Sequence, residues 1–233
     1  MKIGVIVAME KELRQLRDVF SEDEVVVQQC GIGKVNAAIG TMEMIGRHHP
    51  DIIISTGCAG GHGEGVRVQD VVVSAELCYH DVYCGTAIGQ SVYGQVQGMP
   101  ARFQADPMLL EVAINTHHPS PITHHPTLHQ GLIVTGDWFV DSREKMREIL
   151  GHFPEAKAVD MESAAIAQTC YRMGVPFISF RTISDLPLQD VDASMYHNFW
   201  DTIADNSFQL VQTAVNVTSA FPVATSELRA DAL

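Results

Sequence analysis

The stretch AVDMESAAIAQTCY, residues 158–171, changes from strand-like to helix-like sequence within a few residues. It begins as the end of a short apolar run and continues as an alanine-rich segment typical of a helix. Asp160 and Glu162 lie at the changeover, on either side of Met161. One acidic residue there would be explained by its favourable interaction with the positive end of a helix. Two of them indicate a site for a polar ligand, because carboxylates are costly to desolvate.

The same order of strand and helix recurs along most of the chain. Apolar periodicity and turn residues predict strands over residues 3–9, 25–30, 51–56, 131–135, 156–161 and 176–183. They predict helices over residues 10–20, 35–49, 107–118, 143–153, 163–174 and, long and amphipathic, about 195–214. Residues 66–81 read as two strands or one bent strand. This alternation predicts a single α/β domain with a mostly parallel, mixed and twisted sheet flanked by helices.

Composition narrows the range of partners. The 233 residues are 46% apolar and carry a formal net charge of −13, which argues against sequence-independent nucleic-acid binding and against an anionic membrane surface. No stretch is long enough to span a membrane, and the N-terminus lacks the features of a signal peptide. Five cysteines without a CxxC motif favour a reducing compartment, so we expect a cytoplasmic protein. We expect a domain over residues 1–217 and a tail over 218–233.

Polar and small residues collect where predicted strands end, which is where parallel sheets bind ligands. These segments are residues 9–12, 57–61, 135–140, 160–162 and 181–185. TGCAGG, residues 56–61, is expected to be a small-residue loop that admits a ligand to the backbone. FRTISD, residues 180–185, groups Arg181, Ser184 and Asp185, and a general acid is possible there. A tight turn, a helix cap or a structural ion pair would explain each segment alone.

Other motifs point to no cofactor. GIGKVN, residues 31–36, lacks the full GxGxxG fingerprint and does not match a phosphate-binding P-loop. The eleven histidines show no HExxH or zinc-finger spacing, so no metal site is expected.

Seven segments together carry a resemblance to a known family. In chain order they are MKIGVIVAMEKE, GIGKVNAA, DIIISTGCAGG, VVVSAELCYHD, GLIVTGDWFV, AVDMESAAIAQTCY and PFISFRTISD. The sequence resembles the bacterial 5′-methylthioadenosine/S-adenosylhomocysteine nucleosidases of the nucleoside phosphorylase superfamily, over about residues 1–214. The resemblance implies a nucleoside phosphorylase-like fold, a homodimer without cofactor, and hydrolysis of an N-glycosidic bond to release adenine. It places the enzyme in methionine salvage.

The resemblance also implies catalytic roles. Glu12 would activate water, and Asp185 would protonate adenine at N7 so that the base leaves neutral. Arg181 would help to hold the water and Glu162. Glu162 would accept hydrogen bonds from ribose hydroxyls, and its charge would stabilise an oxocarbenium-like transition state. Asp160 would brace this loop.

Further substrate contacts follow from the same resemblance. Phe139 would stack on adenine, the Val140 backbone would read its edge, Ser184 would orient Asp185, and Tyr196 would close over the ligand. The complete set implied to bind substrate is Ala8, Met9, Ile32, Cys58, Gly60, Phe139, Val140, Met161, Glu162, Ser184 and Tyr196.

Three features depart from the family pattern. Cys58 stands where many members have Ser, and only Ser21–Glu24 replaces a hairpin before the second strand. Residues 82–100, which in the family contribute to the partner's 5′-alkylthio pocket, align poorly. A phosphate-dependent nucleoside phosphorylase, an aminodeoxyfutalosine nucleosidase and a non-catalytic nucleoside-binding protein remain alternatives. A phosphorylase would need several arginines, and the predicted site offers Arg181.

Overall fold

The computed structural model describes residues 1–16, 25–85, 91–116, 126–190 and 193–202. Its strands are β1 (Ile3–Val7), β2 (Val25–Gln29), β3 (Ile52–Gly61), β4 (Val71–Tyr79), β5 (Phe103–Gln104), β6 (Leu128–Thr135), β7 (Ala156–Asp160) and β8 (Phe177–Asp185). Its helices are α1 (Glu10–Arg14), α2 (Lys34–His48), α3 (Pro107–Thr116), α4 (Arg143–His152), α5 (Ser163–Met173) and α6 (Ser194–Thr202). The predicted α/β class with a mostly parallel, mixed sheet is confirmed.

The sheet folds back on itself into a ring. β1 pairs in parallel with β2 and β3, and β8 lies between β3 and β4, parallel to β3 and antiparallel to β4. β6 pairs in parallel with both β4 and β7. The ring closes where β7 meets the end of β3 in antiparallel pairing at Gly60 and Gly61. Both positions require glycine, because a Cβ on Gly61 would lie 2.6 Å from Ile183 and one on Gly60 would lie 2.9 Å from Pro187.

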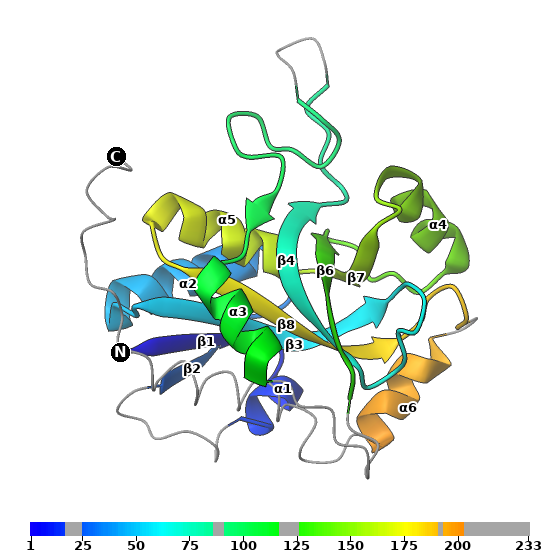
Figure 1. The fold of residues 1–233 in the computed structure, drawn as a ribbon, viewed down its shortest axis with the longest axis horizontal. Coiled ribbons are helices and arrows are strands. Elements are labelled where there is room, and N and C mark those ends of the chain that lie inside the picture. Colours follow the sequence, from blue (N-terminus) through cyan, green and yellow to red (C-terminus); the bar gives the residue numbers. More distant parts are fainter. Residues whose placement is uncertain (17–24, 86–90, 117–125, 191–192, 203–233) are drawn as a thin grey trace.

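Helices cover the sheet on several sides, as Figure 1 shows. α2 and α5 pack against the same core, into which α5 inserts the buried apolar run Ala164–Ala167. α3 lies across β4 and β8 and belongs to a second core with β1 and β8. α4 covers β6 and β7 with Met146 and Ile149.

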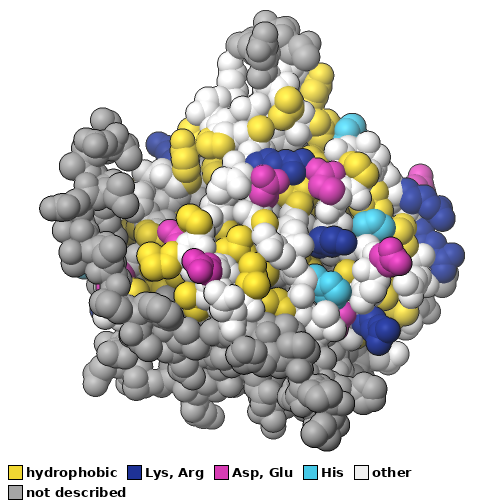
Figure 2. All heavy atoms as spheres, in the orientation of Figure 1, with side chains coloured by type: hydrophobic (Ala, Val, Ile, Leu, Met, Phe, Trp, Pro, Cys, Tyr) yellow, Lys and Arg dark blue, Asp and Glu magenta, His cyan; other side chains and the backbone are white. Residues whose placement is uncertain are grey.

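None of the described helices is both long and apolar enough to cross a membrane. In Figure 2, basic and acidic side chains lie interspersed on the face shown.

Several predicted boundaries were wrong. TGCAGG is not a loop, because β3 continues through it to Gly61, with a shift in register between Ala59 and Gly60. β8 likewise runs on to Asp185. For residues 66–81, of the two alternatives left open the structure has the single strand, β4, whose pairing with β6 shifts between Ser74 and Glu76.

The ends of the predicted helices differ for other reasons. The first helix, expected to reach residue 20, ends at Arg14 with Gln15 as its C-cap. Residues 17–24, which include the segment in place of the expected hairpin, lie outside the described residues, and β2 pairs directly with β1. α6 is described to Thr202, so the predicted continuation to 214 and the 218–233 tail also lie outside.

Candidate active site

A pocket lies where β1, β3, β7 and β8 end, with Tyr196 of α6 in its wall. Its lining residues are Ala8, Met9, Glu12, Ile32, Cys58, Ala59, Gly60, Trp138, Phe139, Val140, Val159, Asp160, Met161, Glu162, Ser184, Asp185 and Tyr196. The pocket therefore brings together all eleven residues expected to contact substrate, as well as Glu12 and Asp185. Arg181 lies behind its wall with 1% of its surface exposed.

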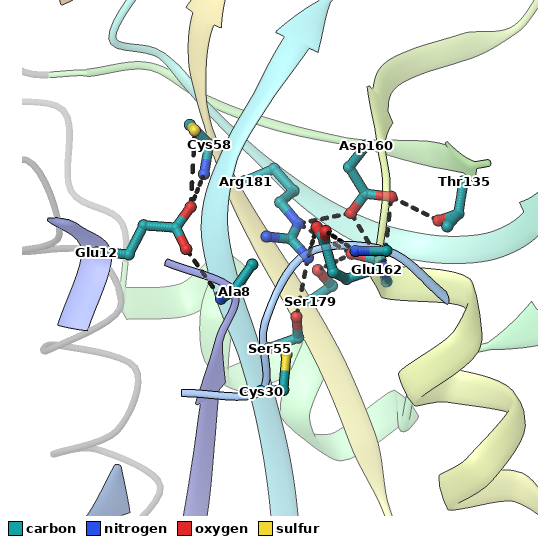
Figure 3. A network of polar contacts seen from close by, with 12 residues as sticks. Ala8, Glu12, Cys30, Ser55, Cys58, Thr135, Asp160, Glu162, Ser179 and Arg181 are labelled. Carbon is teal, nitrogen blue, oxygen red and sulfur yellow. Dashed lines mark hydrogen bonds and ion pairs between the residues drawn. The ribbon is translucent and has the colours of Figure 1, made fainter. Parts of the chain in front are cut away.

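Glu12 is held at one end of the pocket by backbone amides (Figure 3). The N–H groups of Ala8 and Met9 donate to its Oε2, each at 2.9 Å. The N–H of Cys58 donates to Oε1 at 3.0 Å, and the Cys58 Sγ lies 3.6 Å from the same oxygen. Burial raises the pKa of Glu12, while Arg181 and the three amides oppose that rise. The carboxylate is therefore fixed in position, and beside the backbone contact on Oε1 stands only the weakly donating Cys58 thiol.

Arg181 joins the strands beneath the pocket (Figure 3). Its Nε lies 2.7 Å from Asp160 Oδ2 and donates to Ser163 Oγ at 2.9 Å. Its Nη2 donates to Ser55 Oγ at 3.1 Å and lies 3.9 Å from Glu162 Oε2. Burial alone would lower the pKa of Arg181, but the nearby carboxylates outweigh burial and raise the pKa. The guanidinium thus remains charged and compensates acidic groups that would be costly to bury alone.

Asp160 is the main ionic partner of Arg181. It also accepts a hydrogen bond of 2.5 Å from Thr135 Oγ1, and the N–H of Ser163 donates to it at 3.2 Å. The expected bracing role is consistent with these contacts, which connect β6, β7 and the start of α5. Glu162 makes fewer such contacts than Asp160, and its Oε1 accepts a hydrogen bond from the N–H of Gly33 at 2.9 Å. Burial, with a contribution from Asp160, raises the pKa of Glu162 to about 7.

Asp185 lies at the end of β8 in a different environment. Burial raises its pKa to about 6. Ser184 Oγ lies 2.6 Å from Asp185 Oδ1 and 3.2 Å from the carbonyl oxygen of Ala59. The hydroxyl has a single hydrogen, so it donates to Asp185 when that group is ionised. When Asp185 is protonated, the hydroxyl can accept from Asp185 and donate to Ala59 instead, so either protonation state is satisfied.

Aromatic residues form the remaining wall. The rings of Phe139 and Tyr196 meet edge to face at 5.1 Å, and Tyr196 Oη lies 3.9 Å from Met9 Sδ. Asp190 fixes the start of α6 by accepting from the N–H of Met195 at 2.8 Å. Phe139 and Trp138 are 45% and 53% exposed. Such exposed rings beside buried carboxylates suit a flat aromatic ring attached to a polar group.

Sequence reasoning missed part of this site. Trp138 and Val159 line the pocket without having been predicted, whereas Ala59 is a direct neighbour of Gly60, whose neighbours were expected to line the floor of the site. Trp138 stands next to Phe139 in the GDWFV segment, so its aromatic ring was an available signal, whereas Val159 carries none. Among the described residues, no group of three His, Cys, Asp or Glu side chains could hold a metal ion.

Comparison with known proteins identifies the class to which this fold and pocket belong. A model of the phosphorylase superfamily matches residues 19–216. A 5′-methylthioadenosine/S-adenosylhomocysteine nucleosidase of an Exiguobacterium species is 43% identical over 229 residues, covering 91% of this chain and 96% of the relative. The crystal structure of the Neisseria meningitidis nucleosidase with methylthio-immucillin-A has a TM-score of 0.83 at 39% identity, covering 93% of this chain and 99% of that chain.

These matches place the chain among the nucleoside-processing proteins of the phosphorylase superfamily. Within it, the chain belongs to the family of 5′-methylthioadenosine/S-adenosylhomocysteine nucleosidases, which are N-glycosyl hydrolases. A more distant structure, the futalosine hydrolase of Helicobacter pylori, has a TM-score of 0.79 at 25% identity, covering 93% of this chain and 98% of that chain.

Proposed function

We propose that this enzyme hydrolyses the N-glycosidic bond of 5′-methylthioadenosine and S-adenosylhomocysteine to release adenine. The observation that carries the proposal is the pair of buried carboxylates, Glu12 and Asp185, in one pocket with contrasting hydrogen-bond partners. The names of the relatives support the substrates.

In the proposed reaction, the bond between C1′ of the ribose and N9 of adenine breaks as water adds to C1′. Glu12 takes a proton from that water, and Asp185 donates a proton to N7, so adenine leaves as a neutral molecule. Positive charge develops on the ribose in the transition state. Glu162 stabilises this charge, and Arg181 keeps the group of carboxylates electrostatically compensated.

The other lining residues are proposed to bind the nucleoside. Phe139 stacks on the base, and the Val140 backbone reads its edge. Ser184 keeps Asp185 oriented, and Met161 packs under the sugar. The remaining contacts are assigned to Ala8, Met9, Ile32, Cys58, Gly60 and Tyr196.

Phosphorolysis is disfavoured by the state of Arg181. Its guanidinium is buried behind the pocket wall and already engaged by Asp160, Ser163 and Ser55. Among the described residues, no arginine lines the pocket itself. A phosphate in this pocket would also meet Glu12 and Glu162, whose negative charges would repel it.

The assay that tests the function measures adenine release from 5′-methylthioadenosine, S-adenosylhomocysteine, adenosine and aminodeoxyfutalosine, each with and without phosphate. We expect the two 5′-thio-substituted nucleosides to react fastest, with free sugar as product and no dependence on phosphate. Formation of a sugar 1-phosphate only when phosphate is present would replace hydrolysis by phosphorolysis. A clear preference for aminodeoxyfutalosine would replace the substrate assignment.

A homodimer is proposed on the basis of an apolar stripe. Val35, Ile39 and Met42 follow helical spacing along α2 and are 69%, 54% and 45% exposed, and Ile32, just before the helix, is 51% exposed. Such a stripe on a soluble enzyme suits a second copy, and Ile32 would bring that copy to the pocket wall. Sedimentation at assay concentration tests it, and a fully active monomer would contradict it.

Three expectations also remain proposals. They are the division into residues 1–217 and a 218–233 tail, a cytoplasmic location, and a place in methionine salvage. An active chain shortened after residue 217 would support the first of these.

A further inference from the structure

Two successive backbone amides connect the two sides of the pocket. The N–H of Gly33 donates to Glu162 Oε1 at 2.9 Å, on the ribose side. The N–H of Lys34 donates to Asp137 Oδ1 at 2.8 Å, at the foot of residues 137–140, which we call the base loop. Gly33 adopts a φ of +93°, and a Cβ there would lie 3.0 Å from Asp137 Oδ1, so the approach is close.

The Lys34 side chain strengthens the same junction. Its Nζ lies 2.7 Å from Asp81 Oδ2 and 3.7 Å from Asp137 Oδ2. The N–H of Asp137 in turn donates to Asp81 Oδ2 at 2.8 Å. Asp81 follows β4, Asp137 follows β6 and Lys34 begins α2, so the cluster joins three separate segments. It lies outside the pocket lining, and the reaction proposed above makes no use of it.

We propose that Lys34, with Asp81 and Asp137, is a positioning residue that sets the distance between the base loop and Glu162. The inference rests on the proposed function, since it assigns the base to Phe139 and the ribose to Glu162. Lys34 touches neither part of the substrate. It fixes the base loop to the segment that holds Glu162, so that one rigid nucleoside meets both halves of the site at once.

This role has a distinctive consequence for binding. A ligand that spans both halves gains affinity from their correct spacing, whereas a fragment that occupies one half does not. Loss of the Lys34 charge should therefore weaken the binding of the intact nucleoside much more than the binding of either fragment. A residue that only stabilised the fold would change all three affinities together, or none.

The experiment compares Lys34→Met and Asp81→Asn with the wild type. Binding is measured for adenine, for 5-methylthioribose, and for a 5′-methylthioadenosine analogue whose base is attached by an uncleavable carbon–carbon bond. We expect the Kd of the analogue to rise about tenfold, with both fragment Kd values within about twofold of wild type. Lys34→Arg should restore most of the affinity. Arg47→Met is the matched control, because Arg47 forms an exposed ion pair with Glu43 on the same helix, α2.

Two results would overturn the inference. One is an equal rise in the Kd values of the analogue and of both fragments. The other is that Lys34→Met and Asp81→Asn change these Kd values no more than Arg47→Met does. Thermal unfolding of each variant identifies any loss of folded protein, and Asp81→Asn provides a second test if Lys34→Met does not fold. A wild type that released no adenine from the nucleosides would instead overturn the proposed function. The two failures are therefore distinguishable.

Discussion

Glu12 and Asp185 are both carboxylates buried in one pocket, yet their surroundings differ. Glu12 is 1% exposed and accepts three backbone N–H groups, none of which can accept a proton in return. Asp185 is 6% exposed and has as its close partner a hydroxyl, which can donate or accept. Burial raises the pKa of both groups.

Under the proposed mechanism, this difference divides two chemically similar groups between two roles. Donors that only donate, together with the positive charge of Arg181, favour the ionised form of Glu12 against the effect of burial. At Asp185, the further negative charge of Asp190 adds to burial and favours the protonated form. The first environment suits a base and the second an acid, which is the division that N-glycosidic hydrolysis requires.

The largest expected effect comes from Asp185→Asn. The amide keeps the size of the side chain but cannot donate a proton to N7, so adenine would have to leave as an anion. General acid catalysis is worth roughly 10²–10⁴-fold, so kcat for 5′-methylthioadenosine should fall by at least about that much. Steady-state kinetics on folded protein measures it. Near-normal kcat would remove Asp185 from the mechanism.

Glu12→Gln should cause a loss of similar size for a different reason, because water is no longer activated. The two variants separate with a 4-nitrophenyl 5-methylthioriboside, whose leaving group departs without protonation. On this substrate Asp185→Asn should recover most of its activity, whereas Glu12→Gln should not. Equal losses for both variants on both substrates would mean that Glu12 and Asp185 do not act as separate base and acid.

Much of this site could be predicted because it lies at strand ends. Asp160, Glu162 and Asp185 stand at or just beyond the ends of β7 and β8, where local sequence gives both the strand and the polar residue. Arg181 was placed at a strand end by the sequence, but it lies in the middle of β8. The resemblance then supplied roles that spacing alone left open, since a helix cap would have explained Asp185 equally well.

The contacts that join distant segments could not be predicted in the same way. Arg181 was expected to contact Glu162, but its nearer partner is Asp160, at 2.7 Å against 3.9 Å. The TGCAGG segment was read as a loop because its small residues resemble a turn. In fact Gly60 and Gly61 pair with β7, a contact made by residues far apart in the sequence.

A smaller effect concerns stability. The folded pKa of Asp185, about 6, lies above the value near 3.9 expected in the unfolded chain. Between these values the folded state binds more protons, so the residue lowers stability progressively as pH rises from about 4 to about 6. Asn removes this penalty. Asp185→Asn should therefore be more stable than wild type at pH 7, by roughly 3 kcal/mol at most, and should lose this advantage near pH 4.

Urea unfolding of both proteins at the two pH values measures this difference. If Asp185 were instead a helix cap or a structural ion-pair partner, Asp185→Asn would be the less stable protein at pH 7. The catalytic and structural explanations thus predict opposite signs.

The smallest expected effect tests the Glu12 side of the comparison through Cys58. Its Sγ lies 3.6 Å from Glu12 Oε1, and a thiol is a weak donor. A hydroxyl in Cys58→Ser would donate a stronger hydrogen bond to the ionised carboxylate and lower the pKa of Glu12. A hydrogen bond worth about 1 kcal/mol should lower the pKa of Glu12 by a little less than one unit. Because the proposed mechanism requires an ionised Glu12, the acidic limb of the kcat/KM profile should move to lower pH by that amount. Cys58→Ala is the control and should not move the acidic limb to lower pH. The basic limb, which the proposed mechanism assigns to Asp185, should stay in place in both variants. If the Ser and Ala variants shifted the acidic limb alike, the Cys58 side chain would have no influence on the protonation of Glu12, and the backbone amides alone would set it.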